Sequence, residues 1–491
     1  MTTVPQLLDR AATNFPEHPA ILSPAENRTL SYAGLQAAAL SAAGVLGRLG
    51  VHPGDRVALL VGNTIDFPIA FLGILRLGAV AVPLNPRLTQ AEIAALLDHA
   101  EVKAVVAQKP FRDLVPAERQ AVLLDPQELI GQPAEPLPYP KAEDDAEVLY
   151  TSGTTGSPKG ALLTNAAACE TAAMAAYEFG MRPLERVLIA MPLTHSAPLN
   201  LFLVGAIATG SCIVLDSFNP REPAALLQTI QAHKAKYLFA APVAYLLALR
   251  AGPERYDLSS MRRFIYGGAP MAKEQVEAVR KAFGGEWMGV YGLTESGPNG
   301  IALQDRDHPD HAGSLGWHPT INAEVRLVDE YGADVQRNAP GELIMRTPSA
   351  MRGYLKNAEA TAQVLQDGWI HTGDMAFRDV EGYYWMLDRK KDLILSGGFN
   401  VFPREVEEAI LRHPSVADAA VVGTPHPDWG ETVTAVVTLR PGEALTLDEL
   451  REFVRPMLSS QKHPRRLEIV DALPRNPTGK LLKHVIRQRL T

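Results

Sequence analysis

The stretch with the clearest chemical content runs from Tyr150 to Gly160 and reads YTSGTTGSPKG. Its glycines let the backbone bend so that successive N–H groups can point at one anion, and its hydroxyls and Lys159 add donors and positive charge. The sequence contains no G-x-x-x-x-G-K-[ST], so this is not a Walker A loop. A Ser/Thr/Gly-rich surface turn would have a similar composition. The residues nevertheless predict a phosphate-binding loop.

Five further motifs follow this loop: GGAP at 267–270, YGLTE at 291–295, HTGD at 371–374, DRKKD at 388–392 and PRNPTGK at 474–480. Each motif is weak alone, but their order and spacing resemble the adenylate-forming superfamily, which includes acyl-CoA synthetases, peptide-synthetase adenylation domains and luciferases. The chain is identified as an acyl-CoA synthetase of this superfamily. The resemblance implies that a carboxylate attacks the α-phosphorus of MgATP, releasing pyrophosphate, and that the thiol of CoA then displaces AMP.

The resemblance also assigns residues to ATP and Mg²⁺. Substitution at phosphorus needs little covalent help from a protein, so these residues should stabilise charge and position groups. Glu295 is the candidate Mg²⁺ ligand, because Mg²⁺ prefers hard carboxylate oxygens, and Thr294 should contact the α-phosphate. The residues expected to hold the β- and γ-phosphates are Thr151, Ser152, Gly153, Thr154, Thr155, Gly156 and Lys159.

The nucleoside should lie against a second group of residues. By the same resemblance, Gly268 and Ala269, with Tyr291, line the adenine slot, where small side chains let the base approach the backbone. Asp374 should accept hydrogen bonds from the ribose hydroxyls, and Arg389 should brace the same sugar. The HTGD motif alone would favour a surface turn, but it precedes the Asp-Arg pair by some fifteen residues, as in the family.

The C-terminal part should supply a moving lysine and the CoA site. Lys480 resembles the family lysine that bridges the carboxylate and the α-phosphate, and Lys391 occupies the family's hinge position, where a few residues absorb a large backbone change. Rotation of the lid would bring two glycines to the pantetheine arm. The residues implied for CoA are Gly397 and Gly398, and, for its nucleotide end, Arg87, Trp429 and Lys462, although the tryptophan is equally well explained as packing.

His195 lies in an MPLTH stretch that matches the family at the mouth of the acyl pocket, with Thr194 where the family often has an aromatic residue and Pro198 where it has glycine. Leu201, Val243 and Tyr245 are expected to form an apolar wall. The pocket residues predicted are His195, Ser196, Ala197, Val243, Gly268, Gly292 and Asn299.

The segments expected to line the pocket contain no Lys, Arg or Asp, and the one Glu beside them is Glu295; these segments are 195–201, 241–245, 266–269 and 296–301. An uncompensated buried charge on the substrate tail would be costly. The sequence therefore favours an apolar monocarboxylic acid, with a medium or long fatty acid first and a benzoate- or cinnamate-type acid as the alternative.

Other functions compete less well. An amino-acid adenylation domain would place an aspartate near His195 for the substrate ammonium, and none is present there. A luciferase-like oxygenase would share the adenylation residues. A non-catalytic acyl-nucleotide binding protein would have lost catalytic positions, yet these are intact. An α/β-hydrolase is excluded because no G-x-S-x-G occurs.

The bulk properties fit an enzyme of small molecules. The net charge of -8 and the lack of a dense Lys/Arg run argue against nucleic acid. Two cysteines, Cys169 and Cys212, indicate reduced thiols rather than a disulfide scaffold. No signal peptide is recognisable, and 68–84 is expected as a core helix running into a strand rather than a membrane span. We expect a cytoplasmic enzyme that uses ATP, Mg²⁺ and CoA, with a homodimer among the oligomeric states left open.

The organisation of the chain predicts an α/β protein with a large N-terminal domain of layered sheets and helices, residues 1–388, and a small mobile α+β lid, 392–491, joined by a hinge at 389–391. A β-rich subdomain is expected at about 317–388. The basic stretch 480–489 favours a solvated terminal helix. Strands are predicted at 56–61, 186–191, 212–215, 237–240, 263–266, 416–422 and 433–439, and helices at 32–49, 273–283 and 404–412.

Overall fold

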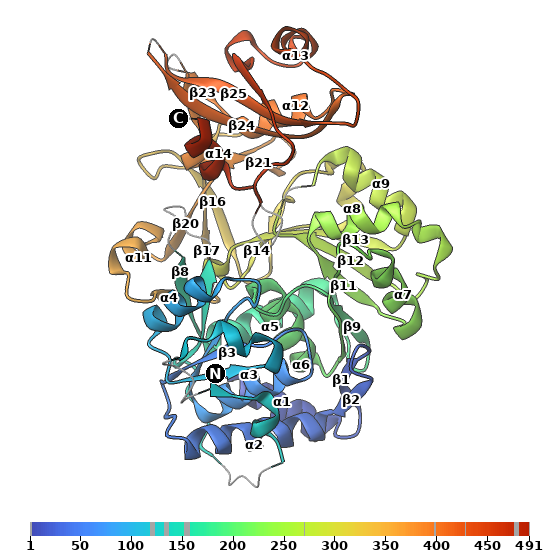
Figure 1. Ribbon diagram of the computed structural model, residues 1–491, viewed down its shortest axis with the longest axis vertical. Coiled ribbons are helices and arrows are strands. Elements are labelled where there is room, and N and C mark those ends of the chain that lie inside the picture. Colours follow the sequence, from blue (N-terminus) through green and yellow to red (C-terminus); the bar gives the residue numbers. More distant parts are fainter. Residues whose placement is uncertain are drawn as a thin grey trace. The chain divides into compact units, whose positions relative to one another are not determined.

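The computed structural model describes residues 2–117, 123–131, 137–151, 158–269, 271–396, 399–427, 429–475 and 481–490. The chain forms two compact units (Figure 1). Unit 1 contains Met1–Val325 and Met345–His371, and unit 2 contains Arg326–Ile344 and Thr372–Thr491. The chain therefore passes between the units three times, and the predicted hinge at 389–391 stays a prediction.

Unit 1 is built on two sheets whose strands are mostly parallel, as the alternation of apolar runs and helices predicts. In the described residues, one sheet has the order β15-β14-β13-β12-β11-β9-β10-β1-β2 and the other the order β18-β8-β7-β4-β3-β5-β6. The strands of the first are β1 Pro19–Ser23, β2 Arg28–Ser31, β9 Arg186–Ile189, β10 Cys212–Leu215, β11 Tyr237–Ala240, β12 Arg263–Gly267, β13 Glu286–Gly292, β14 Gly300–Leu303 and β15 His318–Pro319. Those of the second are β3 Arg56–Leu60, β4 Val80–Pro83, β5 Ala104–Ala107, β6 Leu123–Leu124, β7 Asp145–Thr151, β8 Lys159–Thr164 and β18 Gly353–Tyr354.

Helices cover both faces of each sheet, because alternate residues of the buried strands point into different cores. Val57 and Leu59 of β3 join the core between the sheets, whereas Ala58 and Leu60 join the core under α4. The layer between the sheets contains α1 Val4–Asn14, α2 Tyr32–Arg48, α3 Asp66–Leu77, α5 Asn165–Phe179, the π-helix η4 Ala197–Val204 and α6 Gly205–Thr209. The outer layers contain α4 Gln90–Ala100 on one sheet and α7 Ala224–His233, α8 Pro242–Arg250 and α9 Lys273–Phe283 on the other. Short helices α10 His308–His311 and α11 Ala358–Val364 complete the unit.

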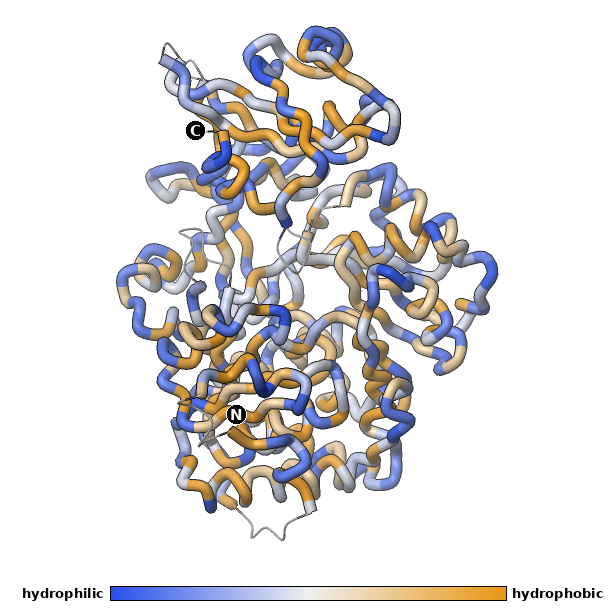
Figure 2. Tube along the Cα trace, viewed as in Figure 1, coloured by the Kyte–Doolittle hydropathy of each residue, from blue (hydrophilic) through white to orange (hydrophobic). Residues whose placement is uncertain are grey.

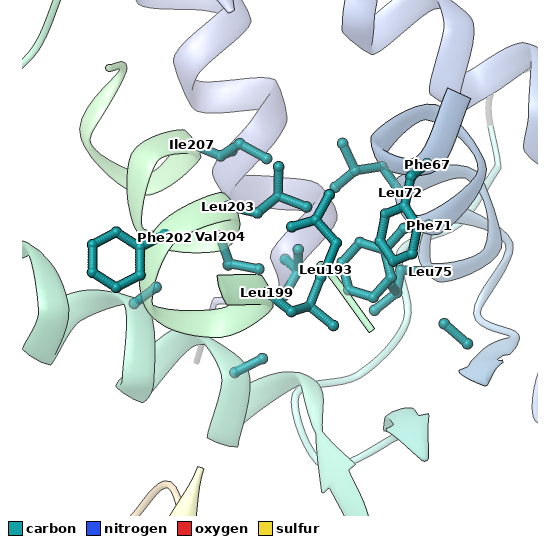
Figure 3. Packing of buried hydrophobic residues seen from close by; sticks show 14 of the residues in the cluster. Phe67, Phe71, Leu72, Leu75, Leu193, Leu199, Phe202, Leu203, Val204 and Ile207 are labelled. Atoms are coloured by element: carbon teal, nitrogen blue, oxygen red, sulfur yellow. The ribbon is translucent and has the colours of Figure 1, made fainter. Parts of the chain in front are cut away.

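The core between the sheets is tightly filled around η4. Figure 2 shows the apolar chain running through the interior of unit 1, with polar residues at its surface. Figure 3 shows side chains of α3 and η4 gathered around Leu193, among them Phe71, Leu72, Leu199 and Leu203. All of these are almost completely buried, and burial of each side chain contributes about 1.5–3 kcal/mol.

Unit 2 has its own, smaller hydrophobic core, formed where the inward faces of β22, β24 and β25 meet α12 and α13. The long antiparallel pair β24–β25 is the centre of its sheet, which has the order β23-β22-β25-β24 with β26 beside β25. Its elements are β22 Ile394–Ser396, β23 Phe399–Val401, α12 Pro403–Ile410, β24 Val416–His426, β25 Gly430–Leu439, α13 Leu447–Val454, β26 Arg466–Ile469 and α14 Lys483–Leu490.

A fourth sheet lies in the segment predicted to be β-rich. Its order is β16-β17-β20-β19, with β21 beside β20. The strands are β16 Glu324–Val328, β17 Gly341–Arg346, β19 Leu365–Gln366, β20 Trp369–Arg378 and β21 Tyr384–Arg389.

The structure agrees with the predicted elements and corrects one expectation about the last helix. The segment 68–84 is helix α3 followed by strand β4, and both cysteines are free thiols. In the described residues, no helix is both long and apolar enough to cross a membrane. The terminal helix α14 is not simply solvated, because Lys483 is largely buried and pairs with Glu407 and Asp388 at 2.9 and 3.5 Å.

Candidate functional site

The predicted phosphate loop joins the two strands of a hairpin. β7 ends at Thr151 and β8 begins at Lys159, and these two residues are opposite each other in the antiparallel pair. Thr151 Oγ1 donates to the carbonyl oxygen of Lys159 at 3.4 Å. A Cβ at Gly160 would lie 2.7 Å from Val148, so this close strand pairing needs glycine. The residues predicted between them, Ser152, Gly153, Thr154, Thr155 and Gly156, lie outside the described residues.

Lys159 and Glu295 are brought together by a residue that the sequence did not reveal, Tyr354. Its hydroxyl donates to Glu295 Oε1 at 2.7 Å, and the Lys159 ammonium lies 5.1 Å from the centre of its ring. Tyr354 is 8% exposed, so these contacts are shielded from solvent. A cation beside a ring face is attracted to it by about 0.5–2 kcal/mol. The cation and the carboxylate are thus separated by one aromatic side chain.

The position of Tyr354 follows from the pairing of strands distant in sequence. β18 adds to the edge of β8, with Tyr354 opposite Ala161. The Met351 N–H donates to the Glu295 carbonyl at 2.8 Å, which ties the same segment to the YGLTE motif. A single tyrosine in a two-residue strand carries no chemical signature, so sequence reasoning had no means to select it.

The predicted α-phosphate and pocket residues also meet. The hydroxyls of Thr294 and Ser196 are 3.1 Å apart, which joins the short helix η6 (Thr294–Ser296) to the turn before η4. His195 lies beside them in sequence and is half-buried. Burial, and next the positive charge of Arg87, lower the pKa of His195, so the neutral imidazole is favoured. Arg87, predicted for CoA, is therefore near enough to act on His195.

The predicted adenine residues lie at the carboxyl ends of adjacent parallel strands, where open α/β sheets usually bind ligands. Gly267 of β12 is opposite Val290 of β13, so Gly268 and Tyr291 each follow one of these partners. Gly268 has a φ of +77°, and a Cβ there would meet nothing within 4 Å. Gly268 and Ala269 are exposed, which leaves this edge accessible to a planar base.

The remaining pocket predictions have different surroundings. Val243 is 46% exposed, and Gly292 is opposite Gly300 where β13 and β14 separate. Asn299 is completely buried, and its side chain bonds to Thr347, Asn322, Thr320 and the Gly300 N–H. Asn299 thus holds neighbouring segments together, and its role in binding an acid stays a prediction.

The expectation that Tyr245 forms a pocket wall is wrong. Tyr245 has no exposed surface, and its hydroxyl donates to the carbonyls of Leu238 and Ile265 at 3.0 and 2.9 Å. Its ring packs against Trp287 with the centres 4.9 Å apart. The sequence spacing placed it near the pocket, but α8 turns this side chain into the outer core.

In unit 2 the two predicted ribose residues form a direct ion pair. Asp374 of β20 and Arg389 of β21 are opposite each other across the strands, with Arg389 Nε 2.5 Å from Asp374 Oδ1. The Asp374 side chain is only 3% exposed. The Asp374 N–H donates to Thr372 Oγ1 at 3.0 Å, which fixes the turn of the HTGD motif. The predicted pair is thus one compact unit of local structure.

The predicted hinge residue Lys391 lies between two aspartates that the last helix holds. Lys483 pairs with Asp388, and Arg487 pairs with Asp392 at 2.6 Å. Lys391 itself is exposed, and partial desolvation lowers its pKa, with further lowering by Arg389 and Arg487.

The residues predicted for CoA are not gathered at one point by any contact in the described residues. The Arg465 guanidinium lies 3.1 Å from the centre of the Trp429 ring, and Lys462 Nζ is 2.7 Å from both carboxylate oxygens of Glu405. Gly397, Gly398 and Lys480 lie outside the described residues.

Comparison with known proteins identifies the family. The model of the AMP-binding enzyme family matches residues 8–355, and that of the AMP-binding enzyme C-terminal domain matches residues 405–480. The chain belongs to this family, the adenylate-forming superfamily predicted from its motifs. Its α/β fold class with a C-terminal domain and its enzyme class, an AMP-forming carboxylic acid–CoA ligase, are thereby confirmed.

The relatives include ligases of different acids. A feruloyl-CoA synthase from Amycolatopsis sp is 36% identical over 466 residues, 94% of each chain. The long-chain-fatty-acid–CoA ligase FadD13 of Mycobacterium tuberculosis is 33% identical over 509 residues, covering 100% of this chain and 99% of the relative. A solved structure of o-succinylbenzoate coenzyme A synthetase from Bacillus subtilis, in complex with ATP and magnesium ion, is 29% identical with a TM-score of 0.88, covering 97% of this chain and 98% of that one.

Proposed function

We propose that this ligase activates an apolar monocarboxylic acid as an acyl-adenylate, with release of pyrophosphate, and then transfers the acyl group to CoA. The observation that carries the proposal is the arrangement of Lys159, Tyr354 and Glu295 at the end of the predicted phosphate loop. A cation and a carboxylate that contact the same ring suit a triphosphate and its metal ion. The cation can contact the phosphates and the carboxylate can bind the metal ion, because the two side chains do not neutralise each other.

Mg²⁺ fits the carboxylate of Glu295. Among the described residues, the second oxygen of this half-buried side chain has no hydrogen-bond partner, while Tyr354 orients the first. A hard, oriented carboxylate oxygen is a ligand that Mg²⁺ prefers. When bound, the ion would neutralise charge on the phosphates. Lys159 would face the same phosphates, and Thr294 would lie beside the α-phosphate.

The other roles follow the resemblance and complete the proposal. Asp374 and Arg389 would hold the ribose, Lys480 would bridge the reacting groups, and Lys391 would be the pivot of the lid. Gly397 and Gly398 would admit the pantetheine arm. The nucleotide end of CoA would meet Arg87, Trp429 and Lys462, of which Lys462 would have to leave Glu405 first.

Two kinds of acid compete for the pocket. A medium or long fatty acid is the choice that the apolar segments favour, and a benzoate- or cinnamate-type acid is the alternative. The packing behind η4 supports the second. Phe179, Phe202 and Phe239 form a stack with 5.2 Å between successive ring centres, and all three are at least 93% buried. A chain that extended past η4 would have to displace these rings, whereas a tail that ended before them would not.

The test is a pyrophosphate-release assay, with and without CoA, over benzoate, a hydroxycinnamate, octanoate, palmitate, malonate and an amino acid. We expect kcat/KM to be highest for an aromatic acid, lower for octanoate and lowest among the apolar acids for palmitate. A preference for malonate or the amino acid would contradict the apolar pocket. Binding of MgATP without pyrophosphate release from any acid would instead indicate a non-catalytic nucleotide-binding protein.

A further inference from the structure

A glutamate lies in the middle of β7, in a strand that is otherwise apolar around it. Glu147 has no exposed surface, and neither has Asn200 of η4, whose Nδ2 donates to Glu147 Oε1 at 2.5 Å. The contact joins residues that are 53 positions apart in sequence. It is a side-chain hydrogen bond between the strand that leads into the phosphate loop and the helix that follows the predicted acid-binding residues.

This pair leaves two buried acceptors without partners. In the described part of the chain, Glu147 Oε2 and Asn200 Oδ1 have no hydrogen bond. An ionised carboxylate in this position would be a buried charge with one donor, which is costly. A proton on Oε2 removes the charge and supplies the O–H that Asn200 Oδ1 lacks. One proton placed between these two oxygens would satisfy both unpaired atoms.

Among the described residues, no opposite charge stabilises the ionised form of Glu147. The partner strand β4 and the helix η4 have no titratable side chain, β8 has Lys159, and α5 has Cys169, Glu170, Tyr177 and Glu178. None of these alters the pKa of Glu147. Burial raises this pKa to about 7, and the hydrogen bond from Asn200 offsets the effect only in part.

The geometry gives the pair a position from which it can act on substrate binding. The π-helix η4 starts directly after Ser196, whose hydroxyl contacts Thr294. π-Helical turns are rare and are frequent at functional sites, because their extra residue shifts side chains out of the α-helical register. Asn200 lies in this segment and is its buried polar anchor to β7.

We propose that Glu147 is held as a neutral acid that donates its proton to Asn200, and that this pair positions η4 and the acid-binding residues at its start against β7. Glu147 is thus a positioning residue for the acid. This inference rests on the proposed function in one respect only, because the positioning effect is measured through the KM for the acid.

The first experiment compares the wild type with Glu147→Gln, because a glutamine amide can donate to Asn200 Oδ1 and accept from Asn200 Nδ2 at every pH. The raised pKa means that the wild type is most stable relative to the variant below pH 4.5 and loses that advantage as pH rises through about 7. We expect the melting temperature of Glu147→Gln, minus that of the wild type, to increase by several degrees over this range and then stay constant. Infrared spectra of the wild type should show a protonated carboxyl band at pH 6 that is absent from the variant.

The second experiment measures the KM for the best acid between pH 6 and 8.5. We expect it to rise several-fold in the wild type and to remain flat in Glu147→Gln, with the KM for ATP changing equally in both. The matched control is Glu178→Gln: this buried glutamate accepts N–H bonds from Ile321 and Gln304, so its variant should be less stable at every pH.

Three results would overturn the inference. A stability difference between Glu147→Gln and the wild type that stayed constant from pH 4.5 to 7 would show that the glutamate is ionised in the folded protein. The absence of the infrared band, which needs no variant to fold, would show the same. Equal pH profiles of the acid KM in both proteins would remove the positioning role. If the wild type showed no ligase activity with any acid, the proposed function would be wrong. The stability and infrared measurements would still test whether Glu147 is protonated.

Discussion

The two groups of predicted nucleotide residues are built in opposite ways. In unit 2, Asp374 and Arg389 are opposite residues of neighbouring strands, and their charges meet at 2.5 Å. In unit 1, Lys159 and Glu295 come from distant segments, and each contacts Tyr354 rather than the other. The first group is already neutralised within the protein, whereas the second keeps a cation and an anion available. The group in unit 1 should therefore respond more strongly than the group in unit 2 to the charge of the nucleotide and its metal ion.

The largest expected effect is in unit 1. Glu295→Gln removes the charge while keeping the shape and the hydrogen bond from Tyr354. We expect pyrophosphate release to fall about 100- to 1000-fold, because one lost charge contact in the transition state has effects of that size. The control is Glu277→Gln on the exposed face of α9, which should retain full activity. Activity within a few-fold of the wild type would show that Glu295 does not act on the metal or the phosphates.

A smaller effect is expected in unit 2. Asp374→Asn removes the negative charge that pairs with Arg389, so the strand pair stays but the ribose support weakens. We expect the KM for ATP to rise about 30-fold, which corresponds to about 2 kcal/mol for a broken charge pair, with kcat changed less. The measurement is the ATP dependence of pyrophosphate release, with the exposed Asp471→Asn as control. If kcat fell and KM did not change, the pair would serve the reaction and not nucleotide binding.

The smallest effect is expected from removing the Tyr354 hydroxyl, which donates a hydrogen bond to Glu295 in unit 1. Tyr354→Phe keeps the ring under Lys159 but removes the donor to Glu295. A hydrogen bond to a charged group contributes about 1.5 kcal/mol, so the affinity for MgATP, measured by calorimetry, should fall about tenfold. In a Glu295→Gln background the same change should have much less effect, because the two residues act together.

The buried Tyr245→Phe is the control for that loss of a hydroxyl. It should lower stability through its two backbone partners and leave the affinity for MgATP unchanged. An equal loss of affinity from Tyr354→Phe in both backgrounds would mean that the tyrosine does not act through Glu295.

Much of the fold could be predicted because it depends on local patterns. The apolar runs at Arg56–Leu60 and Tyr237–Ala240 are buried parallel strands, and the amphipathic stretch Lys273–Phe283 is helix α9. Asp374 and Arg389 could also be selected from their motifs, and a short antiparallel turn brings the two motifs together. In each case the residues that signal the structure are close in sequence.

The parts that sequence reasoning missed depend on contacts between distant segments. Tyr354 acquires its role from the pairing of β18 with β8, and Glu147 acquires its partner from η4. Tyr245 was placed on the wrong side of α8, because spacing alone does not tell which of two cores a helical side chain enters. A π-helix also shifts the register of side chains, so helical periodicity fails at η4.

The ion pairs of α14 make the last helix and the segment around the predicted hinge interdependent. Lys483 is held by Asp388 and Glu407, and Arg487 by Asp392, with little of the carboxylates exposed. A change at either aspartate would weaken the pairing of a poorly solvated cation on α14, so a substitution there should be matched by one on α14. Anyone who grafts C-terminal segments between ligases of this family should therefore transfer 388–392 and α14 from the same parent, because a junction between them would mismatch their charges.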